Sequence, residues 1–263
     1  MTARGIASSN VRRWLLGSTI PLALATSWMI LSHDRRTSYA FVPLGQMAAS
    51  AVELVASGEL VGALAASLAK TATGLVLGVP AGVVVGASMG ASRSLDRALG
   101  PLLHAFRQVP YLGLAPLIGL WFGVSDVAKV LLVFLAVFYP MVLSAYEGVR
   151  NVDSKLIDVA RVLKLDASQV VTKLVLPSVL PHLYTGLSQA IAFAWIATIG
   201  SEMLFHAGGG VGTLMQMGEA AGRLDVVFVG VLSVALASFG LDSLFGLVGR
   251  HVMRWRDDAW SRG

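Results

Sequence analysis

A few polar side chains inside long apolar stretches are the residues of this sequence best placed for chemistry. Arg107 and Gln108 precede a proline-rich break, and Glu202 ends another apolar stretch. Because ionisable groups are costly inside a membrane, such residues are functional candidates by default. Arg107 either attracts an anionic solute or extends its guanidinium to the inner interface. Glu202 either lines an entrance or gate or lies at the headgroup boundary.

Catalytic patterns are missing. The sequence has no His-Glu-x-x-His, no Gly-x-Ser-x-Gly and no Gly-Lys-Ser/Thr phosphate loop, and Gly is never followed by Lys. It contains no cysteine, and its histidines have no metal-ligand spacing. We therefore expect no enzymatic activity, no metal site and no cofactor bound by this chain. If ATP and Mg²⁺ are used, a partner must bind them.

The composition is that of an integral membrane protein. Hydrophobic residues make up 56% of the chain and charged residues 13%, whereas about a quarter is charged in a soluble domain. We predict an all-α fold, a polytopic bundle of about six transmembrane helices. The expected spans are 14–32, 65–90, 98–122, 127–148, 183–204 and 226–248. The basic residues lie between apolar runs without interleaved aromatics, so nucleic acid is not an expected partner.

Two spans have patterns of their own. The span 65–90 has a stripe of small residues at which another helix can approach closely. The span 98–122 is broken near Pro110 and Gly113, and irregular backbone at membrane depth occurs where it is buried or lines a watery cavity. The packing stripe is Gly74, Gly78, Gly82, Gly86 and Gly90. The candidates for a translocation pathway are Arg107, Gln108, Pro110, Trp121 and Glu202.

The polar interval 151–181 predicts a helical hairpin. Residues 155–165 place apolar side chains on one arc and charged ones opposite, which indicates an amphipathic helix. A second helix begins at Asp166, which caps it while Gln169 reaches back, and it ends at Pro177. Lys and Arg concentrate on the side of the membrane that holds this hairpin and both termini. That side is therefore predicted to be the cytoplasm.

The hairpin also carries a family resemblance. Asp158-Val159-Ala160, then Lys164, then Leu174-Val175-Leu176-Pro177 resembles the Glu-Ala-Ala loop of the membrane subunits of ATP-binding-cassette importers. That loop reads Glu-Ala-Ala, three residues, Gly, nine residues, Ile-x-Leu-Pro. Asp158 stands in place of Glu and Lys164 in place of Gly; a left-handed turn there would cost a non-Gly residue about 1–2 kcal/mol.

Three flanking stretches resemble the nitrate, taurine and alkanesulfonate permeases in particular: Arg107-Gln-Val-Pro110, Pro116 to Gly123 and Pro181 to Gly186. The likeness covers roughly residues 64–247. It divides the chain into an N-terminal tail, first helix and external loop (1–63), a permease domain with the coupling loop 151–181 (64–249), and a cytoplasmic tail (250–263).

The resemblance implies a permease subunit of the bacterial cytoplasmic (inner) membrane that imports a small, sulfonate-, nitrate- or taurine-like solute. Its implied partners are a cytoplasmic ATPase, an extracytoplasmic solute-binding protein, a second copy of the chain, and lipid. In the family's mechanism Ala160 is small so that it can pack against the ATPase, and Asp158 makes a polar contact. The implied coupling residues are Asp158, Ala160, Arg161, Lys164, Leu174, Leu176 and Pro177.

Two alternatives remain at this stage. The hairpin's basic residues would also suit a helix lying on lipid, although that role does not need the Ala to Leu-x-Leu-Pro spacing. A transporter or channel driven by an ion gradient would be expected to show paired intramembrane carboxylates and an internal repeat, neither of which is evident.

Overall fold

The computed structural model describes residues 19–20, 22–33 and 41–252, and every regular element in these ranges is a helix. The predicted N-terminal tail, the start of the first span and residues 253–263 lie outside them. After the helix Leu22–His33 come α2 (Leu44–Ala56), α3 (Glu59–Ala91), α4 (Arg93–Gln108), η1 (Tyr111–Leu114), α5 (Ala115–Phe122), α6 (Asp126–Arg150), α7 (Ser154–Val162), α8 (Ala167–Val170), η2 (Val171–Val175), α9 (Leu176–Leu204), α10 (Val211–Ala220) and α11 (Leu224–Val252).

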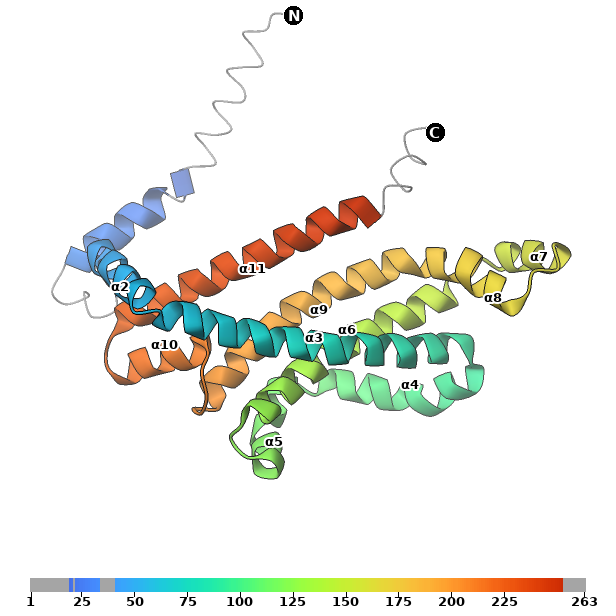
Figure 1. The fold of residues 1–263 in the computed structure, drawn as a ribbon, viewed down its shortest axis with the longest axis horizontal. Coiled ribbons are helices and arrows are strands. Elements are labelled where there is room, and N and C mark those ends of the chain that lie inside the picture. Colours follow the sequence, from blue (N-terminus) through green and yellow to red (C-terminus); the bar gives the residue numbers. More distant parts are fainter. Residues whose placement is uncertain (1–18, 21, 34–40, 253–263) are drawn as a thin grey trace, which may run out of the picture.

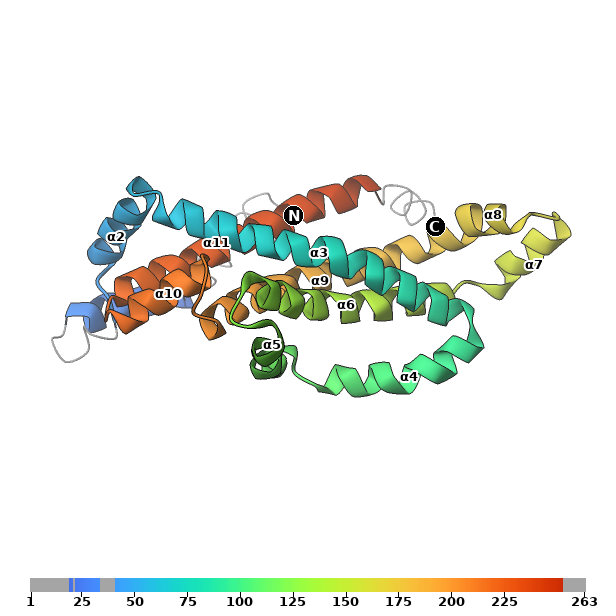
Figure 2. The same ribbon diagram turned by 60° about the horizontal axis from the view of Figure 1, so that its bottom comes forward.

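Four helical stretches in the described part are long and apolar enough to cross a membrane: Glu59–Ala91, Asp126–Arg150, Ala167–Leu204 and Leu224–Leu247. The first three contain α3, α6 and α9, which pack against one another along the long axis of the molecule (Figures 1 and 2). Val133, Val137 and Met141 of α6 form a buried core with alanines of α9. The membrane-helix class is as predicted, while the number of six spans stays a prediction.

The glycine stripe of α3 lies against α6. A Cβ atom on Gly78 would come within 2.8 Å of the Val137 side chain, and one on Gly82 within 2.8 Å of the Phe138 carbonyl oxygen. A Cβ atom on Gly86 would overlap the carbonyl group of Val142. The two backbones therefore approach too closely for any side chain to fit between them.

The expected span 98–122 is not one helix. The helix α4 begins at Arg93 after its cap Ser92, ends at Gln108, and is followed by the short η1 and α5. Pro110 has no backbone N–H to continue the helix, so the break falls where the sequence predicts it. Arg150 of α6 donates a 2.6 Å hydrogen bond to Asp96 of α4, which holds the pKa of that carboxyl below its usual value. Figure 2 shows α4 set apart from the packed helices.

The two ends of the bundle carry different structures. The helices α7 and α8 project at one end, and α2 and α10 lie at the other (Figures 1 and 2). At the second end Arg223 donates to Glu53 and to Asp225, at 3.1 and 3.0 Å, and so ties α2 to the turn between α10 and α11. The hairpin therefore lies at the opposite end of the molecule from α2 and α10.

Candidate functional site

The hairpin at the projecting end begins with α7, which is capped at both ends. The Asp153 carboxylate accepts from the Lys155 N–H at 2.9 Å. At the other end the Leu165 N–H donates to the Ala160 carbonyl, and the Lys164 N–H to the Arg161 carbonyl, both at 3.0 Å. This pair of bonds is a Schellman motif, and it places Lys164 in the left-handed region at φ 51°. The position at which the importer family has Gly thus has the backbone conformation that Gly favours.

The second arm of the hairpin is continuous with a membrane helix. Asp166 and Gln169 form the predicted capping box, with hydrogen bonds of 2.8 and 3.2 Å. The prediction that this helix ends at Pro177 is wrong, because the chain passes through the π-helical turn η2 into α9. Pro177 occupies the first turn of α9. A π turn shifts the hydrogen-bond register, so the missing proline N–H does not stop the helix.

The hairpin presents an apolar surface that excludes Ala160. The chain itself covers Ala160, which is 2% exposed, whereas Val162 is 82% exposed and Val159 and Leu163 are also exposed. Asp158 and Arg161, the predicted polar residues, form an exposed ion pair with each other at 3.0 Å. In the second arm Leu174 is half-buried, and Leu176 and Pro177 are exposed. The apolar side chains that the hairpin leaves exposed are therefore valines and leucines, whereas the chain itself covers Ala160.

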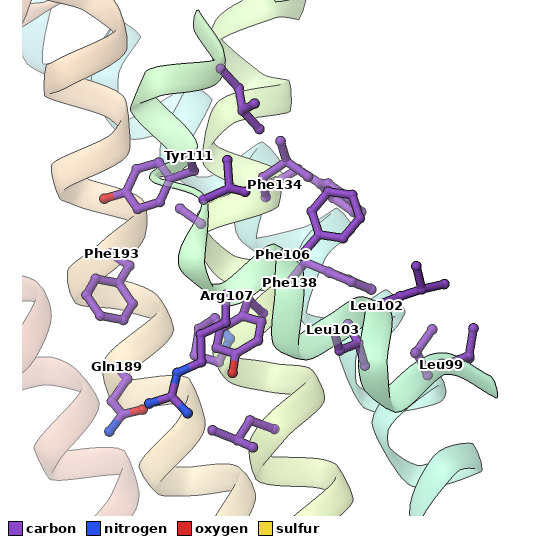
Figure 3. A pocket seen from close by; sticks show the side chains of 18 of the residues that line it. Leu99, Leu102, Leu103, Phe106, Arg107, Tyr111, Phe134, Phe138, Gln189 and Phe193 are labelled. Carbon is purple, nitrogen blue, oxygen red and sulfur yellow. The ribbon is translucent and has the colours of Figure 1, made fainter. Parts of the chain in front are cut away.

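A cavity of about 900 Å³ lies between α4, η1, α6 and α9. Its surface is mostly aromatic and aliphatic, with Arg107 as the one charged lining residue in the described part of the chain. Gln189 of α9 supplies an amide, and the aromatic residues come from four elements (Figure 3). The lining residues are Val85, Leu99, Leu102, Leu103, Phe106, Arg107, Val109, Tyr111, Leu114, Phe134, Leu135, Ala136, Phe138, Tyr139, Pro140, Leu143, Gln189, Ala192 and Phe193.

Arg107 and Gln189 provide the polar side of this cavity together with two tyrosine rings. Figure 3 shows the guanidinium of Arg107 turned toward the wall from which Gln189 projects. A planar cation with several N–H donors beside an amide is suited to bind a carboxylate, sulfonate or similar oxyanion. The aromatic walls are suited to an apolar body attached to that anion.

The other pathway candidates do not line the cavity. Gln108 is the last residue of α4, Pro110 precedes η1, and Trp121 lies exposed on α5. Glu202 is fully buried elsewhere. Sequence reasoning did not identify Gln189 or the tyrosines, since a single amide or phenol in a membrane helix has no distinctive pattern. Arg107, for which the sequence left open an anion-binding role and an interfacial one, lies in the cavity wall.

Glu202 belongs to a buried polar cluster near the C-terminal end of α9. Its carboxylate accepts from Lys70 at 3.1 Å, and from the Ser67 hydroxyl and the Gly212 N–H at 2.9 Å. Ser67 in turn accepts from the Val211 N–H at 2.9 Å. The cluster therefore satisfies two of the free N–H groups at the start of α10, and the carboxylate lies near the positive end of that helix.

Lysine side chains extend the cluster to the loop between α9 and α10. Lys129, which is fully buried, donates to the Ala207 carbonyl, and Lys70 donates to the Gly209 carbonyl. Asp126 lies 3.6 Å from Lys129 and 3.8 Å from Lys70. The triple glycine of the sequence lies within this loop, where a Cβ atom on Gly210 would overlap the Glu202 carboxylate. Glu202 is thus part of a closed ionic cluster and lines no open entrance in this conformation.

The comparisons with known proteins agree with this architecture. Residues 78–254 match the family of binding-protein-dependent transport system inner membrane components. The chain belongs to this family. It is a permease subunit of an ATP-binding-cassette importer, as the resemblance of the coupling loop implies.

Relatives of this family with named substrates match large parts of the chain. The aliphatic sulfonates transport permease SsuC of Bacillus subtilis is 31% identical over 245 residues, which are 93% of this chain and 88% of the relative. The taurine transport permease TauC of Escherichia coli is 31% identical and covers 61% of this chain and 58% of its own length. The nitrate import permease NrtB of Leptolyngbya laminosa is 31% identical over 59% of this chain and 56% of its own length.

A solved structure shows the same fold. The inward-facing MetNI methionine transporter matches with a TM-score of 0.54 at 18% identity, over 75% of this chain and 97% of the matched chain. At this identity the match concerns the fold alone. It agrees with the all-α membrane fold predicted for members of this family.

Proposed function

We propose that this permease imports a small organic anion, such as a sulfonate, whose charged group binds Arg107 and whose apolar part lies against the cavity's aromatic walls. The observation that carries the proposal is Arg107, the single cation among the described lining residues of a cavity whose surface is mostly apolar. A cavity of about 900 Å³ is near the upper end for small-molecule sites. An inorganic ion such as nitrate would leave most of that apolar surface without contact.

The partners follow from the same proposal. A separate cytoplasmic ATPase binds ATP and Mg²⁺ and receives the exposed apolar surface of the hairpin, formed by Val159, Val162 and Leu163. An extracytoplasmic solute-binding protein delivers the anion to the opposite end, where α2 and α10 lie. Two copies of the chain form the transport unit. Both termini and the hairpin lie in the cytoplasm of a bacterial cell with this permease in its inner membrane.

The decisive experiment is solute uptake into proteoliposomes that contain the permease, its ATPase and its binding protein. Pentanesulfonate, taurine and nitrate would be compared with and without internal ATP. We expect ATP-dependent uptake, with pentanesulfonate taken up best. Uptake that persists without ATP when an ion gradient is present would contradict the importer mechanism, and equal uptake of nitrate would contradict the organic anion.

The Arg107→Gln variant tests the anion site. It removes the charge and retains much of the length, so we expect at least about a tenfold rise in the KM for pentanesulfonate, the effect of about 1.4 kcal/mol. The Arg107→Lys variant keeps the charge without the planar guanidinium. Its KM for pentanesulfonate should lie between those of the parental permease and Arg107→Gln. ATP hydrolysis in the absence of binding protein should be unchanged in both. An unaltered KM for pentanesulfonate in Arg107→Gln would show that Arg107 does not bind the anion.

A further inference from the structure

The loop between α9 and α10 is held by charged side chains that are buried within the protein. Lys129 is fully buried in α6 and Lys70 is almost so in α3, and each donates to a carbonyl of the loop, at Ala207 and Gly209 respectively. Glu202 and Asp126 balance the two positive charges. Helices α3, α6 and α9 thus all contribute charged groups around one short segment.

Stability alone does not account for this buried ionic cluster. Removing charges from water is so costly that well-packed apolar side chains often stabilise a protein as much as a buried ion pair. Buried ionisable groups between the helices of a membrane protein are accordingly candidates for a function. Each lysine also has a carboxylate partner that it keeps if the loop carbonyls move away, Glu202 for Lys70 and Asp126 for Lys129.

The same loop begins with Phe205, whose buried aromatic ring fills the space beside α5. Phe205 is buried against Ala115 and Ile118 of α5 and against the start of α6. A Cβ atom on Gly119 would come within 2.8 Å of the Phe205 ring, so the fit leaves no spare room. Leu114 packs on this cluster and also lines the cavity that contains Arg107. Contacts therefore run from the ionic cluster through Phe205 to the cavity wall.

We propose that residues 205–210 form the external gate of this permease and that Lys70, Lys129 and Glu202 are the positioning residues that hold it closed. Opening separates the two lysines from the loop carbonyls, withdraws Phe205 from α5 and gives the solute access to the cavity. The orientation of the gate rests on the proposed function, in which the hairpin is cytoplasmic. The ionic lock itself rests on the contacts of this chain.

A single cysteine can report the gate, because the chain has none of its own. Ala115 is 3% exposed beneath Phe205, so Ala115→Cys should react slowly with a membrane-impermeant maleimide in proteoliposomes that contain the complete transporter. Adding Lys129→Met should raise the labelling rate about tenfold by increasing the population of the open state. Lys129→Arg should restore slow labelling. Met217→Cys, at an exposed position of α10, serves as the control reporter and should label equally in all backgrounds.

Further variants separate gating from folding. Phe205→Ala leaves the ionic cluster intact and removes the buried ring, so it should also speed labelling. Glu202→Gln should do so by weakening the hydrogen bonds that Glu202 accepts from Lys70 and from the Gly212 N–H, which tie the loop to α9. All three should raise ATP hydrolysis in the absence of binding protein, a change that general destabilisation would not produce. Labelling at the parental rate in both Lys129→Met and Phe205→Ala, in folded protein, would overturn the proposal.

The proposed function and the gate can fail separately. Absence of ATP-driven uptake by the parental transporter would reject the proposed function, whereas the labelling comparison requires no solute and still decides whether the loop is locked. Normal uptake with unchanged labelling in the variants would reject the gate alone. Labelling from the hairpin side of the membrane only would reject its external location.

Discussion

Lys164 shows how one residue can carry a conformational cost at a functional element. It holds φ 51° within the turn that ends α7, a backbone conformation in which a residue with a Cβ atom is less stable than Gly by about 1–2 kcal/mol. The turn's two hydrogen bonds are nevertheless formed. The motif is therefore maintained by the surrounding hairpin rather than by the preference of the residue at its centre.

Replacing Lys164 with Gly should stabilise this turn. We expect hydrogen exchange at the Leu165 amide, which donates to the Ala160 carbonyl, to slow by about fivefold, because roughly 1 kcal/mol of backbone strain is relieved. Lys164→Ala removes the same charge and keeps the Cβ atom, so it is the matched control. Equal exchange in the Gly and Ala variants would show that the strain is absent.

The contact between α3 and α6 is set by glycines at the level of the element. Gly86 lies where a Cβ atom would overlap the Val142 carbonyl group, which is backbone and cannot rotate away. Overpacking of such a site costs about 1–3 kcal/mol. The Gly86→Ala variant should therefore lower the Tm of the purified permease in detergent, measured by circular dichroism.

Gly62, on the same helix, provides the control. A Cβ atom there meets nothing within 4 Å, so Gly62→Ala should leave the Tm unchanged or raise it, since Ala is favoured over Gly in a helix by up to about 1 kcal/mol. If both variants shifted the Tm alike, the close approach of α3 and α6 would not be the cause.

Patterns that depend on neighbours along the chain were predictable. The glycine stripe follows the helical period, and the capping box of Asp166 and Gln169 depends on residues only three positions apart. The sequence could not identify α6 as the helix that the stripe meets, since periodicity defines a face and not its partner. Likewise Lys70 and Glu202 are separated by 132 positions, and no local pattern indicates that they pair.

The sequence also did not predict that the second arm of the hairpin continues through Pro177 into α9. A proline after a helical pattern normally indicates an end, and the π turn that accommodates it depends on hydrogen bonding that the residue types do not reveal. In the cavity, a charge inside an apolar span pointed to Arg107, whereas Gln189 and the aromatic lining are ordinary residues of membrane helices. Only their convergence in three dimensions makes them a candidate site.

For the whole molecule, the exposed surface of the hairpin leads to a prediction about assembly. Val162 is 82% exposed, so Val162→Asp changes the outer surface without inserting a charge into the hairpin itself. We expect the ATPase to co-purify with the parental permease from mild detergent and to be lost with Val162→Asp. The Val162→Leu variant keeps the surface apolar and should retain the ATPase.

Two results would count against this assembly. Retention of the ATPase by Val162→Asp would place the contact elsewhere on the hairpin, and loss with Val162→Leu as well would indicate a general requirement for the valine shape. Ala160→Asp is a less specific test, because the chain itself buries Ala160 and the substitution would disturb the hairpin before any partner binds.

The helical stretch that continues from the hairpin through the π turn to Glu202 can act as a lever arm. Ala167–Leu204 spans 38 residues, or about 57 Å at 1.5 Å per residue, roughly twice the hydrocarbon thickness of a bilayer. One end of this lever belongs to the hairpin, and the other carries a carboxylate of the ionic cluster. In the proposed orientation, a displacement of the hairpin end is transmitted along this helical stretch to the ionic cluster at its other end. Inserting a flexible glycine segment at the π turn should leave ATP hydrolysis running while solute movement stops.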